Sequence, residues 1–295
     1  MFKNKILFFT ILALIISFIG CKSDKEEPII GLVSGDGLFS TDTIADPGQL
    51  FRIRIKGTSG SQPATNFRIL VETNGITRTA LDSGIYSENF DFIKSFYFAG
   101  NDIEKWSFCI KNKDGFVAST SIIIKRNLNA LYGPINEFPN ITLKMQSNES
   151  GNMLILKLGT VISAASSANY QSDVDFLSYY SSVNFYTLSS PNETEAPGFY
   201  PSILSMTNKN EIRYKEGFTS ITPNVYDSVM NDSIILASYD NSVVGKKKAK
   251  NVFPENVVSF AVQTGPMAGK KGLIKIIETN GESTGNIKLS IKIQR

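Results

Sequence analysis

Apolar and polar residues alternate along much of this chain, which is the pattern of strands with one buried face. In residues 51–56, Phe, Ile and Ile alternate with Arg, Arg and Lys. Residues 287–293 show the same pattern, with Ile or Leu at every second position and Lys or Ser between them. Because successive side chains of a strand point to opposite faces of a sheet, this period of two predicts β-strands.

Residues 29–126 contain several such segments, and turn signals separate them. The sequence Thr73-Asn74-Gly75 marks one hairpin-like turn, and Asn-Lys-Asp-Gly at residues 112–115 marks another. Roughly seven short strands in about 100 residues favour an antiparallel β-sandwich. The Cys…Trp…Cys spacing of antibody domains does not occur in this segment, so we do not expect an antibody-type domain.

The second half of the chain is predicted to be a separate domain. Residues 127–139 are interpreted as a linker, because a Gly-Pro pair and Pro139 interrupt regular structure there. Residues 140–295 again show short alternating segments, with one helix expected near residues 223–230 and Thr222 as its cap. The predicted fold is therefore mainly β, with a β-sandwich followed by a larger β-rich domain that has one or two short helices.

The N-terminal segment differs from the rest of the chain in composition. Lys3 and Lys5 form a positive region, and the apolar stretch that follows at residues 6–19 is too short to span a bilayer comfortably. This pattern predicts a signal peptide at residues 1–20. The next segment, residues 21–28, is rich in charged residues, which predicts a solvated tether.

The end of the apolar stretch, Phe18-Ile19-Gly20-Cys21, resembles the lipobox of bacterial lipoproteins. The resemblance implies that Cys21 is acylated and becomes the mature N-terminus, and that the protein is lipid-anchored in the outer membrane. The acidic residues after the cysteine partly resemble the surface-export signal of Bacteroidetes lipoproteins, with Lys25 interrupting them. We therefore expect the membrane as a partner through Cys21, in either a surface-exposed or a periplasm-facing orientation.

Several further stretches resemble an uncharacterised family of Bacteroidetes lipoproteins. Residues 106–126 are similar to the closing hairpin of Ig-like modules in such proteins, which implies an Ig-like β-sandwich at residues 29–126. The family implies location and fold, and it supplies no activity and no site residues. The other stretches that carry the resemblance are residues 168–176, 187–191, 222–232, 269–276 and 285–294.

The residue types present limit the chemistry. The sequence has no histidine, which excludes Ser-His and Cys-His nucleophile pairs, His-ligated zinc and haem, and imidazole acid–base chemistry. With Cys21 acylated, Cys109 is left without a disulfide partner, and we expect a buried thiol. The net charge of +3 is small and the basic residues are scattered, so nucleic acid is not an expected partner. No catalytic residue, metal or cofactor is predicted.

Three pairs of adjacent aromatic residues lie in one region, at residues 179–180, 185–186 and 199–200. Neighbours on a strand point to opposite faces, so one ring of each pair can reach solvent while the other packs inward. Exposed rings in a row suit stacking on sugars, and ordinary core and cross-strand packing is the alternative explanation. The residues predicted to contact a ligand are Tyr179, Tyr180, Tyr186, Phe199 and Tyr200.

Charged residues supply further candidates. Asp173 and Asp175 lie two apart on a predicted strand, so they form either a calcium or acid–base pair or a polar outer face. Residues 246–250, Lys-Lys-Lys-Ala-Lys, are expected to form a solvated loop, with contact to anionic lipid or polysaccharide as the alternative. The triplet Asp42-Thr43-Ile44 resembles the O-glycosylation acceptor of Bacteroidetes, which implies glycosylation at Thr43.

Three functions are compatible with these observations. The first is a non-catalytic lipoprotein of the cell envelope with a binding or scaffolding role, and a glycan is the expected ligand by analogy of location and fold. The second is an adhesin or assembly subunit that binds an envelope protein through a sheet edge or a loop rim. The third is a carboxylate-dependent glycoside hydrolase, which needs two carboxyl groups in one cleft about 5–9 Å apart.

Overall fold

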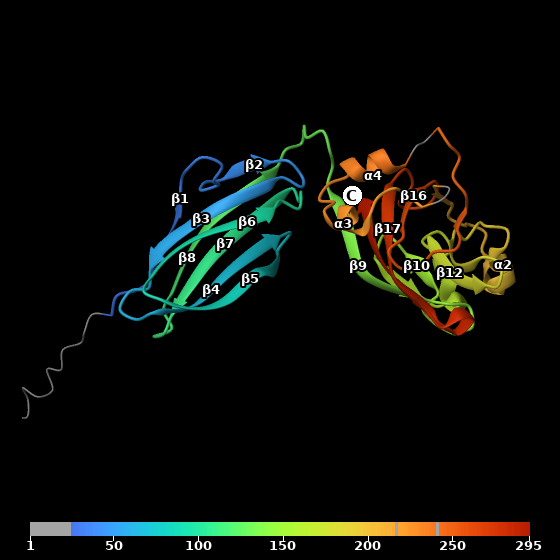
Figure 1. Ribbon diagram of the computed structural model, residues 1–295, viewed down its shortest axis with the longest axis horizontal. Helices are drawn as coiled ribbons and strands as arrows, with labels where there is room; N and C mark the ends of the chain where they lie inside the picture. The colour runs from blue at the N-terminus through green and yellow to red at the C-terminus, as the bar shows by residue number, and fades with distance from the viewer. Residues whose placement is uncertain (1–24, 216–217, 240–241) are drawn as a thin grey trace, which may run out of the picture. The chain divides into compact units, whose positions relative to one another are not determined.

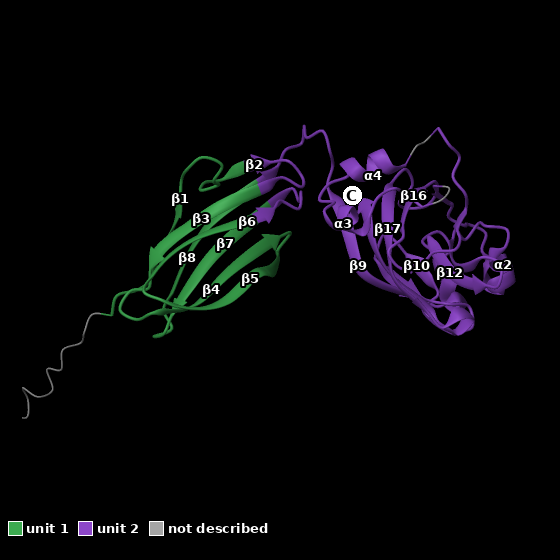
Figure 2. Ribbon diagram, in the orientation of Figure 1, with its two compact units in different colours: residues 1–43, 51–95, 104–124 green, residues 44–50, 96–103, 125–295 purple. Residues whose placement is uncertain are grey.

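The computed structural model describes residues 25–215, 218–239 and 242–295. The predicted signal peptide, Cys21 and the start of the predicted tether lie outside these residues. The described chain is mainly β and forms several sheets, as predicted (Figure 1). Figure 2 shows its two compact units, one made of the described residues up to 43 with 51–95 and 104–124, and one made of 44–50, 96–103 and the described residues from 125.

The first eight strands form two sheets, which we call the N-terminal sandwich. One sheet has the order β1-β3-β6 and the other β2-β8-β7-β4-β5, which matches the A-B-E and G-F-C strands of Ig-type sandwiches. The ring centroids of Phe51 on β3 and Trp106 on β7 are 5.0 Å apart, so the two sheets share a core. The predicted Ig-like sandwich is confirmed. Its strands are β1 (Ile29–Val33), β2 (Thr43–Ala45), β3 (Leu50–Thr58), β4 (Ala64–Thr73), β5 (Ile76–Ser87), β6 (Asn89–Tyr97), β7 (Ile103–Asn112) and β8 (Val117–Arg126).

The β4–β5 hairpin confirms the turn predicted at Asn74-Gly75. Thr73 pairs with Ile76, so the loop has two residues, and both have positive φ angles, 51° and 77°. This geometry is that of a type I′ turn, which asparagine and glycine adopt at little cost. β5 is an edge strand, and its register against β4 shifts at two points. Such shifts discourage another strand from pairing with the edge.

The remaining strands form two five-stranded sheets, which we call the C-terminal sandwich. Their orders are β11-β10-β12-β13-β15 and β14-β16-β17-β18-β9. Phe176 on β12 meets Phe260 on β16 edge to face at 5.0 Å, within a core to which both sheets contribute. Its strands are β9 (Ile135–Lys144), β10 (Met153–Ile155), β11 (Thr160–Ile162), β12 (Phe176–Ser181), β13 (Phe185–Ser189), β14 (Ile212–Tyr214), β15 (Lys248–Ala249), β16 (Val257–Val262), β17 (Lys271–Asn280) and β18 (Asn286–Gln294).

β9 corrects the predicted linker. This strand begins at Ile135, so the second half of residues 127–139 belongs to the sheet. β9 is an edge strand beside β18, and the register between them shifts where Pro139 lies, between the pairs made by Phe138 and Ile141. Proline has no N–H to donate, and a bulge on an edge strand tolerates it. The proline that suggested a linker therefore marks a bulge.

A short helix covers one face of β18. α3 (Pro223–Asp227) begins as predicted, and the Thr222 side chain accepts a hydrogen bond from the Val225 N–H at 3.3 Å. Beneath it, Ser290 and Lys292 on β18 are buried. The Lys292 amino group donates to three backbone carbonyls at the end of α3 and just beyond it, and burial lowers its pKa. The position of α3 therefore depends on β18.

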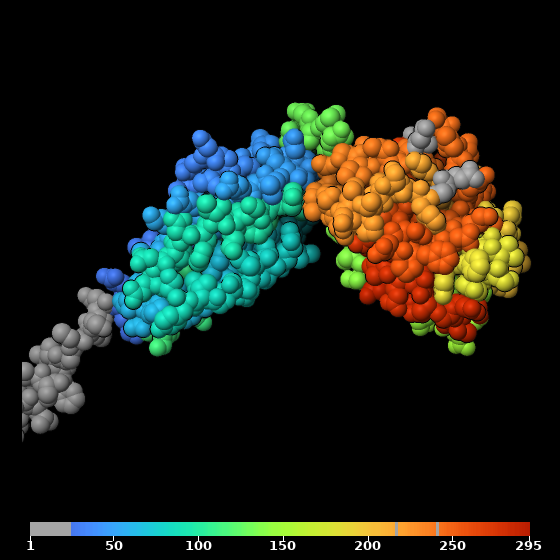
Figure 3. All heavy atoms as spheres, viewed as in Figure 1, coloured from blue at the N-terminus to red at the C-terminus, as the bar shows by residue number. Residues whose placement is uncertain are grey.

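A smaller core lies on the other face of the β10–β12–β13 sheet. Met153 and Leu177 from the sheet pack there against Ala196 and Ile203 from short helices. Figure 3 shows atoms near α2, in yellow, at the surface of the C-terminal sandwich. No helix in residues 25–215, 218–239 and 242–295 is long and apolar enough to cross a membrane. The other helical segments are η1 (Ala164–Tyr170), α2 (Ala196–Phe199), η2 (Pro201–Ser205), α4 (Ser233–Ser238) and η3 (Glu282–Thr284).

Candidate functional site

The β12–β13 hairpin carries most of the aromatic residues that the sequence singled out. Leu177 and Tyr179 of β12 lie in the smaller core, whereas Phe176 lies in the main core and Tyr180 packs against it. The adjacent residues Tyr179 and Tyr180 therefore point to opposite faces of the sheet, as the alternation of a strand predicts. The two faces give these rings different surroundings.

Tyr179, Phe199 and Tyr200 form what we call the buried aromatic cluster. The rings of Tyr179 and Phe199 are stacked with centroids 3.9 Å apart. Tyr179 is 0% exposed and Tyr200 is 3% exposed. The Tyr200 hydroxyl donates to the backbone carbonyl of Ser178, and the Tyr179 hydroxyl donates to Glu195 at 3.4 Å. Burial raises the pKa of both phenols.

The burial of these two tyrosines corrects part of the predicted ligand surface. An external ligand cannot reach a ring that is enclosed by other side chains, so Tyr179 and Tyr200 are core residues in this structure. Phe199 is half-buried and stacks on Tyr179, so its ring also serves packing. The alternative stated above, ordinary core packing, describes these three residues.

The other face of the hairpin holds what we call the open aromatic cluster, made of Tyr180, Phe185, Tyr186 and Phe253. The ring centroids of Tyr180 lie 5.1 Å from Tyr186 and 6.2 Å from Phe185, and Phe185 lies 6.4 Å from Phe253. Phe185 is 42% exposed and Phe253 is 44% exposed, while the two tyrosines are half-buried. Partial burial and the nearby Glu282 carboxylate raise the pKa of Tyr180, so its hydroxyl keeps its proton. These rings combine apolar surface with hydroxyl groups.

Phe185 has a backbone conformation that is unusual for its side chain. It follows a three-residue loop between the paired residues Ser181 and Phe185, and its φ angle is 48°. This left-handed region favours glycine and is costly for a bulky residue. A strained residue with an exposed ring is a pattern that functional sites often show.

Two members of the open aromatic cluster were not among the predicted contacts. Phe185 belongs to one of the aromatic pairs, but alternation alone could not say which ring of that pair faces solvent. Phe253 lies far from the hairpin in sequence, and no local signal connects it to Phe185. Phe253 is brought next to Phe185 because the residue before it, Val252, pairs with the hairpin: the Val252 N–H donates to the Tyr186 carbonyl at 3.1 Å.

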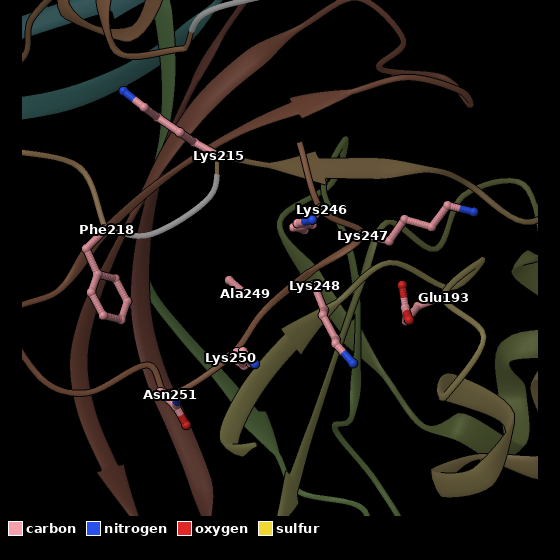
Figure 4. A pocket seen from close by; sticks show the side chains of 9 residues that line it. All are labelled: Glu193, Lys215, Phe218, Lys246, Lys247, Lys248, Ala249, Lys250 and Asn251. Carbon is pink, nitrogen blue, oxygen red and sulfur yellow. The ribbon is translucent and has the colours of Figure 1, made fainter. Parts of the chain in front are cut away.

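Beside this cluster lies a cavity of about 580 Å³, which we call the lysine cavity. Residues 246–250, which were predicted to form a solvated loop, line this cavity. The structure corrects that prediction, because Ala249 pairs with Leu188 and Lys248 pairs with Ser189 of β13. Figure 4 shows residues 246–251 between Phe218 and Glu193. The residues that line it are Glu193, Lys215, Phe218, Lys246, Lys247, Lys248, Ala249, Lys250 and Asn251.

Carboxylates hold two of these lysines. Lys248 forms an ion pair with Glu195 at 2.6 Å, and its amino group holds the pKa of Glu195 below its usual range. The same carboxylate accepts a hydrogen bond from the Asn184 side chain at 3.3 Å, in the loop of the hairpin. Lys247 lies 3.8 Å from Glu211, and its amino group points away from the centre of the cavity in Figure 4. Glu195 thus joins the lysine cavity to the hairpin loop.

Asp173 and Asp175 do not form the predicted pair on one strand face. Both precede β12, and Asp175 is buried while Asp173 is half-buried. Asp175 accepts hydrogen bonds from the Leu156 N–H at 2.8 Å and from the Asn210 side chain at 3.0 Å. Burial raises its pKa to about 7. Among the described residues, no three Cys, Asp or Glu side chains group as metal ligands.

The other predicted residues lie apart from these features. Thr43 is half-buried at the start of the short edge strand β2, and the preceding Asp42 accepts a hydrogen bond from the Ile123 N–H at 2.8 Å. Cys109 on β7 is half-buried rather than buried, and desolvation raises the pKa of its thiol. Cys21 lies outside the described residues.

Comparison with known proteins gives weak structural similarity. No protein-family model matches the chain, and no curated protein matches it. Among solved structures, the chain is similar to a DUF4466 family protein from Parabacteroides merdae, with 14% identity and a TM-score of 0.49 over 92% of this chain and 99% of that one. It is also similar to the sporulation control protein Spo0M from Bacillus subtilis, with 8% identity and a TM-score of 0.26 over 81% of this chain and 80% of that one.

Proposed function

We propose that this protein is a lipid-anchored component of the bacterial outer membrane that binds a glycan without catalysing a reaction, and that the open aromatic cluster is its contact surface. Phe185 is the observation that carries the proposal. Its ring is exposed, and its backbone has a positive φ angle that glycine would adopt more easily. A large apolar side chain at such a position contributes little to the stability of the core. We therefore infer that the exposed Phe185 ring contacts a ligand.

The chemistry of the cluster suits a sugar. Pyranose rings present C–H groups on their faces and hydroxyl groups at their edges, so aromatic faces and phenol hydroxyls complement them. Phe185 and Phe253 supply exposed faces. Tyr180 and Tyr186 supply hydroxyl groups beside them, and the Tyr186 hydroxyl also accepts a hydrogen bond from the Glu282 N–H at 3.3 Å. The four rings form a chain of contacts, from Tyr186 through Tyr180 and Phe185 to Phe253.

A glycan array with residues 22–295 tests this proposal. We expect the protein to bind one class of glycan, and we expect Phe185→Gly and Phe253→Ala to reduce the signal at least tenfold. Tyr86→Ala is the matched control, because Tyr86 is an aromatic residue that is 76% exposed on β5, outside the cluster. Binding that survives both phenylalanine substitutions, or an array without signal, would contradict the proposal.

The membrane anchor needs its own test. We expect wild-type protein to fractionate with outer membranes and Cys21→Ser to appear in the soluble fraction, because the substitution removes the thiol that would be acylated. Membrane fractionation followed by immunoblotting measures this difference. If Cys21→Ser stays with the membranes, the anchor assignment is wrong, whereas the proposed glycan surface would be unaffected.

A protein partner on β5 is a second candidate function. β5 is a long edge strand, and Ile76 and Tyr86 are exposed at its two ends, a combination that can recruit a partner strand. Its two register shifts oppose such pairing, so we place the glycan first. Crosslinking on cells would favour the second candidate if it captured one partner and Ile76→Ala with Tyr86→Ala abolished the capture.

The third candidate, a carboxylate-dependent glycoside hydrolase, has no comparable observation in its favour. Such enzymes need two carboxyl groups facing one substrate. Among the described residues that line the lysine cavity, one carries a carboxylate, Glu193. We therefore do not propose hydrolysis at this site.

A further inference from the structure

The lining of the lysine cavity carries an excess of positive charge. Of the nine described residues that line the cavity, five are lysines and one is a glutamate. Along an extended chain alternate side chains share a face, so Lys246, Lys248 and Lys250 line one side of the segment that contains β15. Ala249, between them, packs against the main core. Packing of Ala249 against the main core therefore fixes the position of the segment that carries these lysines.

The carboxylates of the described residues leave Lys250, one of these lysines, without an ion pair. Lys248 and Lys247 have carboxylate partners in Glu195 and Glu211. Of the carboxylates within the described chain, none lies within 4.0 Å of the Lys250 amino group, which is exposed. Because a partly enclosed site screens charge less than open water does, an anionic group entering the cavity would gain charge-assisted hydrogen bonds there.

The lysine cavity and the open aromatic cluster share one short piece of chain. Asn251 lines the cavity, and its N–H donates to the carbonyl of Asn184 in the hairpin loop at 3.0 Å. Phe253 follows two residues later and lies 6.4 Å from Phe185. Phe253 lies three positions after Lys250, which is at most about 11 Å of extended chain. The two features are therefore joined by a chain segment no longer than a short oligosaccharide.

We infer that the ligand is an acidic polysaccharide, whose carboxylate or sulfate groups enter the lysine cavity while its sugar faces stack on the open aromatic cluster; this inference rests on the proposed function. A lone small anion would use the lysines and leave the aromatic rings unexplained. An anionic membrane surface is flat, whereas the lysines line a cavity, and an amphipathic helix of the kind that binds membranes does not accompany them, since β15 is a strand.

Isothermal titration calorimetry with residues 22–295 tests the inference. The probes are polygalacturonate, alginate and hyaluronan as carboxylated polysaccharides, chondroitin sulfate as a sulfated one, and dextran and xyloglucan as neutral ones. We expect at least one acidic probe to bind ten times more tightly than either neutral probe. We also expect its affinity to fall about tenfold between 50 mM and 300 mM NaCl, because salt screens exposed charges.

The variants separate the cavity from general charge attraction. We expect Lys246→Gln with Lys250→Gln to weaken acidic-probe binding about tenfold, the size expected from losing charged hydrogen bonds. Lys105→Gln with Lys125→Gln is the control, because both residues are exposed lysines of the N-terminal sandwich and the change in net charge is the same. The control should change affinity less than twofold.

The failures of the two proposals differ. If neutral and acidic probes bind equally well, and Phe185→Gly weakens both while the cavity variant weakens neither, the inference is overturned and the proposed function stands. If no polysaccharide binds, both are overturned. If vesicles of phosphatidylglycerol and phosphatidylcholine bind through Lys246 and Lys250 and no polysaccharide does, the cavity is a lipid site and the inference is wrong.

Discussion

The two faces of the β12–β13 hairpin hold aromatic residues of the same kind in different surroundings. In the buried aromatic cluster, Tyr179 of β12 packs against Phe199 of α2 and Tyr200 that follows it, and the hydroxyl groups have protein partners. The open aromatic cluster starts from Tyr180, the next residue along the chain, and ends at the exposed rings of Phe185 and Phe253.

The comparison shows that covering elements, and not the aromatic residues themselves, decide the role of each face. Tyr179 and Tyr180 differ by one position and have the same side chain. The chain after β13 turns back over the Tyr179 face and places Ala196 and Ile203 on it. On the other face, Tyr180 packs against the main core, whereas Phe185 and Phe253 remain exposed. Both faces therefore contribute to a core, and the difference lies in the two rings, Phe185 and Phe253, that stay exposed.

The largest expected effect is on the buried face. We expect Tyr179→Ala to lower the free energy of unfolding by about 3–5 kcal/mol, because it removes a fully buried ring and leaves a cavity. Urea denaturation followed by far-UV circular dichroism measures the loss. A loss below about 1 kcal/mol would mean that the two faces do not differ in the way described.

Asp175, which directly precedes β12, should make stability depend on pH. Its pKa is about 7 in the folded protein and about 3.9 in an unfolded chain. The folded state therefore binds the proton more tightly, and the free energy of unfolding should fall as the pH rises from about 4 to about 7, by roughly 3 kcal/mol in total. Urea titrations at several pH values should show this slope in wild type and a smaller one in Asp175→Asn. Equal slopes would remove Asp175 as the cause.

A smaller effect is expected at Tyr200. Tyr200→Phe keeps the ring and removes the hydroxyl that donates to the Ser178 carbonyl. We expect a loss of about 1–2 kcal/mol, because a buried carbonyl would lose its partner. The same urea experiment measures it, and Tyr86→Phe at an exposed site is the control. No loss at Tyr200 would show that the carbonyl finds another donor.

The smallest effect on stability, with the largest effect on binding, is expected at Phe185. Phe185→Gly removes a bulky side chain from a left-handed backbone position, so the free energy of unfolding should stay unchanged or rise by up to about 1 kcal/mol. Glycan binding should nevertheless be lost. A variant that loses about 2 kcal/mol or more of stability would instead make Phe185 a structural residue, and the distinction between the two faces would disappear.

The strands could largely be predicted from the sequence, because their evidence is local. The alternation in residues 287–293 and the turn at Asn74-Gly75 depend on neighbours in the chain, and both are confirmed. Pro139 was misread because the same residue type marks linkers and edge bulges, and only the pairing of β9 with β18 separates the two.

The candidate site could be predicted only in part. Alternation indicated that Tyr179 and Tyr180 face opposite ways, but it could not show which face the later helices cover. Phe253 joins Phe185 through the pairing of residues 251–252 with the hairpin, which no local pattern reveals. The lysines at 246–250 were visible as a charged run, whereas the cavity that they line depends on Phe218 and Glu193 from other segments.

The pairing of β9 with β18 has a consequence for how this protein folds. Lys144 pairs with Asn286, so the sheet hydrogen bonds of β9, the first strand of the C-terminal sandwich, form only when β18, the last strand, is in place. The Lys292 amino group, which holds the end of α3, also arrives with that last strand. Contacts between distant parts of a chain slow folding. The C-terminal sandwich should therefore assemble late and in one cooperative step, well after the hairpins of the N-terminal sandwich have formed on the emerging polypeptide.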